Sequence, residues 1–304
     1  AIAGIGWDQF HIDGVEFWGQ ISLLKGALVH ADYLSTVSQA YSEEIQTEEF
    51  GCGLNGILRK RASRLCGIVN GVDYSKWNPE SDTFIERNYS AETVSQGKAV
   101  NKKELIRQFG LNPECLSKPL IGVVARLAYQ KGIDLLVEAL PDLLKNDVAL
   151  TILGTGEFNL EEALSRLARE NSGVCGVRIA YDERMAHLIQ AGADMFLMPS
   201  RYEPCGLTQL YSLKYGTVPI VRKTGGLADT IRDADENPDG NGFVFEESSV
   251  AALRDAVSRA VAAFRTTQRW NEIVRRGMAQ DFSWTTAARA YENLYRKILR
   301  EAEM

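Results

Sequence analysis

The alternation of short apolar runs with helix-length segments between residues 120 and 245 is the feature that most constrains the fold of this chain. Parallel strands need a long crossover connection, which a helix usually supplies. The alternation therefore predicts a doubly wound, Rossmann-like α/β domain around a parallel sheet. The predicted strands are residues 120–125, 149–153, 177–180, 195–198, 218–221 and 243–245, and the predicted helices between them are residues 133–144, 160–170, 183–191, 207–215 and 227–233.

The segments that flank this domain are predicted from caps, turns and periodicity. Asn101 and Glu104 have the spacing of a capping box for a helix over residues 102–109, and Gly110 is placed to end that helix. Residues 74–97 are rich in Ser, Asn, Glu and Pro and carry no sustained period, which predicts a linker or a surface excursion. Further helices are predicted at residues 15–31, 39–46, 54–65, 250–264, 268–279 and 285–302, and short strands at residues 33–37 and 68–69.

Composition and charge argue against several classes of protein. The chain has 34 basic and 40 acidic residues, and a net charge of -6 disfavours a protein that coats nucleic acid. No apolar run approaches the ~20 residues of a membrane helix, so no membrane partner is expected. The five cysteines form no C-x-x-C pair and the three histidines lie far apart. This pattern predicts reduced thiols and structural histidines, and no metal site.

Two loops that follow predicted strands and precede helices are suited to bind an anion. In an open α/β sheet, ligands bind beyond the carboxyl ends of the strands, where the free N–H groups of helix N-termini favour phosphate. The first loop lies in residues 199–211 and holds Glu203, which either acts on a ligand or only offsets the helix dipole. The second, Lys223-Thr-Gly-Gly-Leu227, fits anion binding through its paired glycines, with a tight turn and a solvated Lys223 as the alternative.

Three further features bear on the kind of ligand. Arg126 and Lys131 follow the first predicted strand of the domain, and two cations on one loop can converge on a diphosphate, although ordinary surface cations are the alternative. The turn from Gly154 to Gly156 lacks the third glycine of the dinucleotide-binding pattern, so a nicotinamide-dependent oxidoreductase is disfavoured. Tyr181 follows a predicted strand, where its ring either stacks on a nucleobase or packs internally.

The order, spacing and identity of several segments together resemble the bacterial glycogen synthase and plant starch synthase family. The segments are residues 17–24 (FWGQISLL), 36–45 (TVSQAYSEEI), 70–73 (NGVD), 124–132 (VARLAYQKG), 199–211 (PSRYEPCGLTQLY) and 222–227 (RKTGGL). The resemblance covers almost the whole chain.

This resemblance implies a GT-B fold, in which two Rossmann-like domains face each other across a cleft. It implies a glycosyltransferase that moves glucose from ADP-glucose to the non-reducing end of an α-1,4-glucan with retention of configuration, without a metal ion or other cofactor. Related sucrose and trehalose enzymes carry a second Glu at the position that Tyr211 occupies here. That departure favours the group that uses ADP-glucose.

The resemblance also assigns roles to loop residues. Arg126 and Lys131 would hold the diphosphate, Glu203 would contact the transferred glucose near the reacting centre, and Tyr181 would stack on adenine. Backbone amides at the start of a helix would meet phosphate, and a second turn would line the same pocket. The further substrate-binding residues implied in this way are Asn70, Gly206, Leu207, Thr208, Lys223, Thr224, Gly225 and Gly226.

The family pattern begins with a K-x-G-G-L loop that has no counterpart before residue 17, so we expect a chain that lacks the first part of its N-terminal domain. The expected parts are the end of an acceptor-side domain at 1–75, a nucleotide-sugar-binding domain at 76–282 and a helix at 283–304 that returns to the N-terminal domain. Such a chain would be inactive or weakly active, and a non-catalytic nucleotide-sugar or glucan-binding module is the alternative. A bacterial cytoplasm is preferred to a plastid, because nothing resembles a transit peptide.

Overall fold

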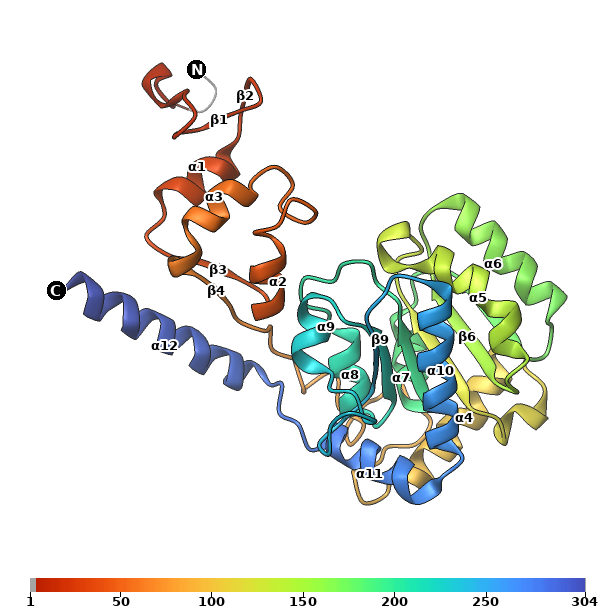
Figure 1. Ribbon diagram of the computed structural model, residues 1–304. Helices are drawn as coiled ribbons and strands as arrows, with labels where there is room; N and C mark the ends of the chain where they lie inside the picture. Colours follow the sequence, from red (N-terminus) through yellow and green to blue (C-terminus); the bar gives the residue numbers. More distant parts are fainter. Residues whose placement is uncertain (1–3, 304) are drawn as a thin grey trace.

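A six-stranded parallel sheet forms the centre of the larger part of the chain (Figure 1). The computed structural model describes residues 4–303. The strand order is β10-β9-β8-β5-β6-β7. The chain adds β6 and β7 on one side of β5, and then adds β8, β9 and β10 on the other side. The strands are β5 (Leu120–Val124), β6 (Ala149–Gly154), β7 (Cys175–Ile179), β8 (Met195–Met198), β9 (Val218–Arg222) and β10 (Phe243–Phe245).

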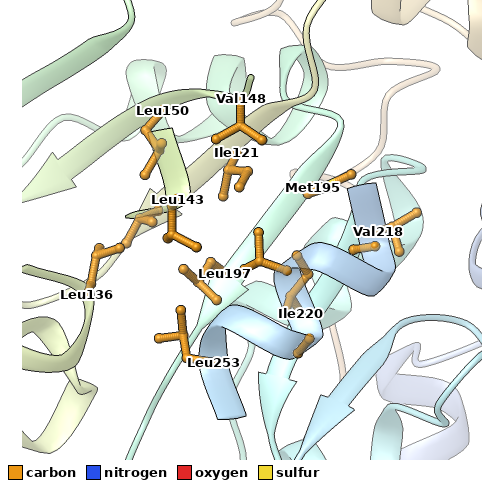
Figure 2. Packing of buried hydrophobic residues seen from close by; sticks show 14 of the residues in the cluster. Ile121, Leu136, Leu143, Val148, Leu150, Met195, Leu197, Val218, Ile220 and Leu253 are labelled. Atoms are coloured by element: carbon orange, nitrogen blue, oxygen red, sulfur yellow. The ribbon is translucent and has the colours of Figure 1, made fainter. Parts of the chain in front are cut away.

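Helices cover both faces of this sheet and bury a separate apolar cluster on each. One cluster joins the sheet to α5 (Ile133–Leu144), α6 (Phe158–Glu170) and α10 (Val250–Phe264), and Figure 2 shows Leu136, Leu197 and Leu253 meeting there. The other cluster includes residues of α4 (Val94–Phe109), α7 (Glu183–Gly192), α8 (Thr208–Lys214) and α9 (Gly225–Thr230). Strands β5, β6, β8 and β9 are buried on both sides, which explains why they form continuous apolar runs in the sequence.

The doubly wound domain agrees closely with its sequence-based prediction. Strands β8 and β10 and helices α5 and α10 have the predicted bounds, and the other predicted strands and helices of the sheet differ at their ends. Helix α11 (Thr267–Met278) follows α10 near its predicted position. A short turn of 3-10 helix, η4 (Tyr129–Lys131), precedes α5, and another, η3 (Pro113–Leu116), precedes β5.

The predicted capping box at Asn101 is wrong. Helix α4 begins at Val94 and Asn101 lies inside it, fully buried. The Asn101 side-chain oxygen accepts hydrogen bonds from the backbone N–H groups of Glu86 and Arg87, at 2.8 and 3.2 Å. The residue therefore fastens an upstream segment to the helix instead of capping it. Gly110 ends the helix with φ of 65°, as predicted.

Residues 74–93, which we call the strap, lie mostly at the surface, as predicted, but buried side chains anchor them in the domain. Asp82 and Tyr89 are only 5% and 3% exposed. The Tyr89 hydroxyl donates to the backbone carbonyl of Tyr215 at 2.8 Å, within the domain core. The strap is therefore a surface segment that is fixed to the domain at a few buried side chains, whose polar groups find hydrogen-bond partners there.

The N-terminal part forms a smaller, looser unit above the sheet in Figure 1. The helix predicted over residues 15–31 is wrong in its first half, where a hairpin turns at Trp18 and Gly19, both with positive φ. The strand predicted at residues 68–69 lies a little earlier in the chain, at β4 (Leu65–Gly67). The elements are η1 (Trp7–Gln9), β1 (Glu16–Phe17), β2 (Gln20–Ile21), α1 (Leu23–His30), β3 (Leu34–Thr36), α2 (Gln39–Glu44), α3 (Asn55–Lys60), η2 (Ala62–Arg64) and β4 (Leu65–Gly67). Strands β3 and β4 pair in parallel.

Helix α12 (Trp284–Ala302) runs away from the sheet toward the N-terminal part (Figure 1). Ala287 is its single buried residue within the described range. The Tyr33 hydroxyl donates to the Glu301 carboxylate near the end of α12, and the Lys297 ammonium lies 5.4 Å from the Tyr33 ring centroid. The expected division into domains at residues 1–75, 76–282 and 283–304 stays a prediction. Among residues 4–303, no helix has both the length and the hydropathy needed to cross a membrane.

Candidate functional site

A cavity of about 460 Å³ lies at the carboxyl ends of the adjacent strands β5 and β8. This is the point at which the strand order reverses, where open α/β sheets bind their ligands. The cavity brings together many of the residues singled out from the sequence. Those on its wall are Asn70, Arg126, Lys131, Glu203, Gly206, Leu207 and Thr208.

An ion pair joins two loops of this cavity. The Lys131 ammonium lies 2.5 Å from a carboxylate oxygen of Glu203, and the hydroxyl of Ser200 donates to the same oxygen at 3.1 Å. Glu203 is only 6% exposed. Gly132, with φ of 66°, makes this approach possible, because a Cβ there would lie 2.0 Å from the Pro199 carbonyl oxygen. The ion pair was not predicted, since its partners lie on loops 72 residues apart in the chain.

The start of α8 presents free backbone donors to the same cavity. Gly206 has φ of 69°, in the left-handed region that favours glycine. The N–H groups of Gly206, Leu207 and Thr208 donate to no backbone carbonyl of residues 4–303, and no side chain caps the helix. Burial raises the pKa of the neighbouring Cys205 thiol, which keeps it neutral. Free N–H groups beside the Lys131 cation favour an anion with several oxygen atoms.

A second cavity, of about 630 Å³, adjoins the first and shares Val124, Ala125 and Arg126 with it. Tyr181 lines the second cavity and is 91% exposed, so its ring is free to receive a flat group. Asp182 caps α7 by accepting from the Met185 N–H at 2.9 Å, which fixes the residue next to Tyr181. The wall also includes Gly154, Thr155, Gly156, Glu183 and Trp77, which belongs to the strap.

Arg126 lies between the two cavities. Its guanidinium donates to the Gln130 side chain at 2.6 Å. Together the cavities can hold a molecule with a flat ring at one end, a polyanion in the middle and a polar group near Glu203 at the other end.

The Lys223–Gly226 turn is on the wall of neither cavity. Lys223 pairs with Glu246 at 2.6 Å in solvent. The Thr224 hydroxyl and the Gly225 N–H both donate to a Glu44 carboxylate oxygen, at 2.9 and 2.8 Å, so the anion at this helix start belongs to α2.

Gly225 and Gly226 instead support the loop that carries Glu203. A Cβ at Gly225 would lie 2.0 Å from the Glu203 carbonyl oxygen, and one at Gly226 would lie 1.9 Å from that of Cys205. The Gly226 N–H donates to the Glu203 carbonyl at 3.0 Å. The paired glycines therefore allow close packing behind the first cavity, and a direct role of this turn in substrate binding stays a prediction.

Family models match most of the chain in two segments. Residues 103–276 match the model described as Glycosyl transferases group 1, and residues 1–60 match the Starch synthase catalytic domain model. The first match spans the sheet and the walls of both cavities except Asn70 and Trp77.

Curated relatives agree with these matches. Glycogen synthase 2 of Nitrosococcus oceani is 52% identical over 291 residues, which are 94% of this chain and 59% of the relative. Glycogen synthase of Koribacter versatilis is 49% identical over 292 residues, which are 96% of this chain and 60% of the relative. The chain thus spans about three-fifths of the length of these relatives.

Solved structures agree as well. The catalytic domain of Starch Synthase IV from Arabidopsis thaliana, bound to ADP and acarbose, matches with a TM-score of 0.90 and 32% identity over 97% of this chain and 62% of that chain. Anabaena Alr3699/HepE, in complex with UDP and glucose, matches with a TM-score of 0.61 at 19% identity over 88% of this chain and 64% of that chain, which bears on the fold alone. The predicted GT-B type of fold and the resemblance to glycogen and starch synthases are confirmed. The chain therefore belongs to the group 1 glycosyl transferases.

Proposed function

We propose that this chain carries the donor-binding part of a retaining glucosyltransferase. The enzyme would transfer glucose from ADP-glucose to the non-reducing end of an α-1,4-glucan, as a glycogen or starch synthase does. The observation that carries this proposal is the pair of adjoining cavities, with Arg126 between them, at the switch point of the sheet. Their succession of flat-ring, polyanion and polar subsites matches the order of adenine, diphosphate and glucose in ADP-glucose.

The diphosphate would lie between the cations and the start of α8. Breaking the sugar–phosphate bond leaves additional negative charge on the departing diphosphate. Lys131, Arg126 and the free N–H groups of residues 206–208 are already positioned before that charge develops. Preorganised donors of this kind stabilise a transition state without the cost of reorganisation. We propose that these groups serve the transfer without a bound metal ion.

Glu203 would act at the glucose end of the site. As a buried carboxylate it can accept a hydrogen bond from a sugar hydroxyl and stabilise positive charge that develops at the reacting carbon. Its ion pair with Lys131 fixes the carboxylate. The same pair would hold the cation next to the bond that breaks. The glucose and the leaving diphosphate would thus be held by two partners of one ion pair.

The relatives support a particular donor and a particular acceptor substrate for this enzyme. Starch Synthase IV was solved with ADP and acarbose, and it is 32% identical to this chain. This supports ADP as the nucleotide and an α-glucan as the acceptor here. The curated relatives named above are bacterial glycogen synthases, which supports a bacterial enzyme of glycogen synthesis, for which the cytoplasm is the expected compartment.

Binding and transfer should be measured separately. Calorimetric titration of the chain with ADP-glucose, UDP-glucose and ADP should show saturable binding with preference for the adenine nucleotides. Transfer of labelled glucose from ADP-glucose to glycogen should be measured for the chain and for a fusion that adds the part of the Nitrosococcus relative outside the match. Binding by both proteins with transfer by the fusion supports the proposal. Binding without transfer by either would favour a non-catalytic nucleotide-sugar module, and absence of binding would refute both.

A further inference from the structure

Trp77 is the residue through which the strap reaches the second cavity. Its indole lies between two other rings. The ring centroids are 3.6 Å from that of His187 and 4.0 Å from that of Tyr211, with interplanar angles of 14° and 4°. Because both faces of the indole are covered, the part that remains to line the cavity is an edge of the ring.

The two stacking partners belong to helices that begin at the cavities. His187 lies on α7, which starts just after Tyr181, and Tyr211 lies on α8, whose start carries the free N–H groups. The indole is therefore wedged between the helices that present the flat-ring subsite and the polyanion subsite. Its position is set by the same elements that set those subsites.

A buried hydrogen-bond network fixes this wedge. Asp82, also in the strap, accepts from the Tyr215 hydroxyl at 2.5 Å, and the same carboxylate oxygen lies 2.7 Å from Nδ1 of His187. Asp82, His187 and Tyr215 are 5%, 1% and 0% exposed. Burial alone would raise the pKa of Asp82, but the hydrogen bonds from His187 and Tyr215 outweigh it and hold that pKa below its ordinary value. The carboxylate thus stays charged and holds the His187 ring flat against Trp77.

We propose that Trp77 is a base-positioning residue of the donor site. Its indole edge bounds the cavity that Tyr181 also lines and restrains the base of a nucleoside diphosphate stacked on that ring. This inference rests on the proposed function. A base on a ring as exposed as Tyr181 is free to slide, and a rigid edge beside it limits that motion. Edge-to-face contact and a donated N–H bond both suit an indole edge against a heterocyclic base.

The test compares a ligand that has a base with one that has none. ADP and inorganic pyrophosphate are titrated calorimetrically into the whole chain, into Trp77→Phe and into the control Trp7→Phe, which changes a tryptophan that is 85% exposed and lies on neither cavity. Trp77→Phe keeps an aromatic wedge but shortens its edge and removes the N–H donor. We expect ADP affinity to fall about five- to tenfold in this variant, while pyrophosphate affinity stays within twofold and the control is unchanged.

Other outcomes overturn the proposal in distinguishable ways. Equal losses for ADP and pyrophosphate would mean that Trp77 only spaces the helices, and no loss for either would mean that it does not touch the base. If the unchanged chain binds no ADP, the proposed function itself fails.

A measurement on the unchanged chain covers the case in which the variant does not fold. Among the described residues, Trp77 is the single tryptophan on either cavity. ADP should therefore quench tryptophan emission at saturation while pyrophosphate should not. Binding of ADP by calorimetry without quenching would overturn the base contact.

Discussion

Replacing Lys131 by methionine tests the ion pair of the first cavity. Methionine keeps the length of the side chain and removes its charge, which leaves the Glu203 carboxylate with Ser200 alone. Removing one partner of a buried ion pair costs about 3–5 kcal/mol. Because the side chains of Lys131 and Glu203 are 22% and 8% exposed, we expect the lower end of that range, about 3 kcal/mol.

The companion variant Glu203→Gln separates charge from shape. Glutamine still accepts hydrogen bonds from Lys131 and Ser200, so this change alone should lower the free energy of unfolding by about 1 kcal/mol. The double variant has neither charge, so no unpaired charge is left buried. Its free energy of unfolding should therefore fall by about 2 kcal/mol, which is less than the fall for Lys131→Met alone. The expected coupling between the two positions is thus about 2 kcal/mol.

Urea unfolding followed by circular dichroism measures all members of this cycle. Lys131→Met should also lower the melting temperature by about 6–10 °C. Titration with ADP adds a functional readout, because Lys131→Met should weaken binding at least about tenfold while Glu203→Gln leaves it nearly intact. A stability loss below about 0.5 kcal/mol for Lys131→Met, or strictly additive losses in the double variant, would refute the view that this pair is buried and coupled.

Three further predictions concern other parts of the molecule. Arg126→Ala should weaken ADP binding about tenfold at low salt, less at high salt, with unchanged melting temperature, since Arg126 is exposed; calorimetry at two salt concentrations checks this. Asp82 has a lowered pKa, so its charged form stabilises the fold at pH values above 3.8, the ordinary pKa of the group. This stabilisation is lost as the pH falls through the lowered pKa. Between pH 6 and pH 2 the melting temperature should therefore fall more steeply for the parent protein than for Asp82→Asn. Asp229 accepts from the N–H groups of Gln39 and Ala40 at 2.6 and 3.1 Å, so Asp229→Ala should speed hydrogen exchange of those amides at least about tenfold, and unchanged rates would mean that α2 is held otherwise.

The sheet and its polyanion site were predictable because they follow from local patterns. A parallel strand buried on both faces reads as a continuous apolar run, and the carboxyl ends of neighbouring strands meet at one edge. Arg126 and Lys131 lie in the segment after β5, and Glu203 lies in the segment after β8. Because these strands are neighbours in the sheet, the topology brings the three residues to one cavity. The roles of these residues toward a ligand came from the family resemblance, because the loop pattern alone left ordinary surface cations and an acid that only offsets a helix dipole as alternatives.

The features that escaped prediction depend on partners far away in the chain. The strap reads as a linker because its residues are polar, yet Asp82 is buried against His187, 105 residues later. The Lys223–Gly226 turn reads as an anion site, and the anion it meets is the carboxylate of Glu44, 180 residues earlier. Asn101 fits the capping-box spacing by chance, since its acceptor oxygen serves backbone donors of the strap. The spacing of residues within one segment does not predict contacts with residues far away in the chain.

A crystal structure of the chain with ADP tests the central claim most directly. We predict that the diphosphate lies between Lys131, Arg126 and the N–H groups at the start of α8, and that the adenine stacks on the Tyr181 ring. A complex in which neither Arg126 nor Lys131 contacts the diphosphate would contradict this assignment.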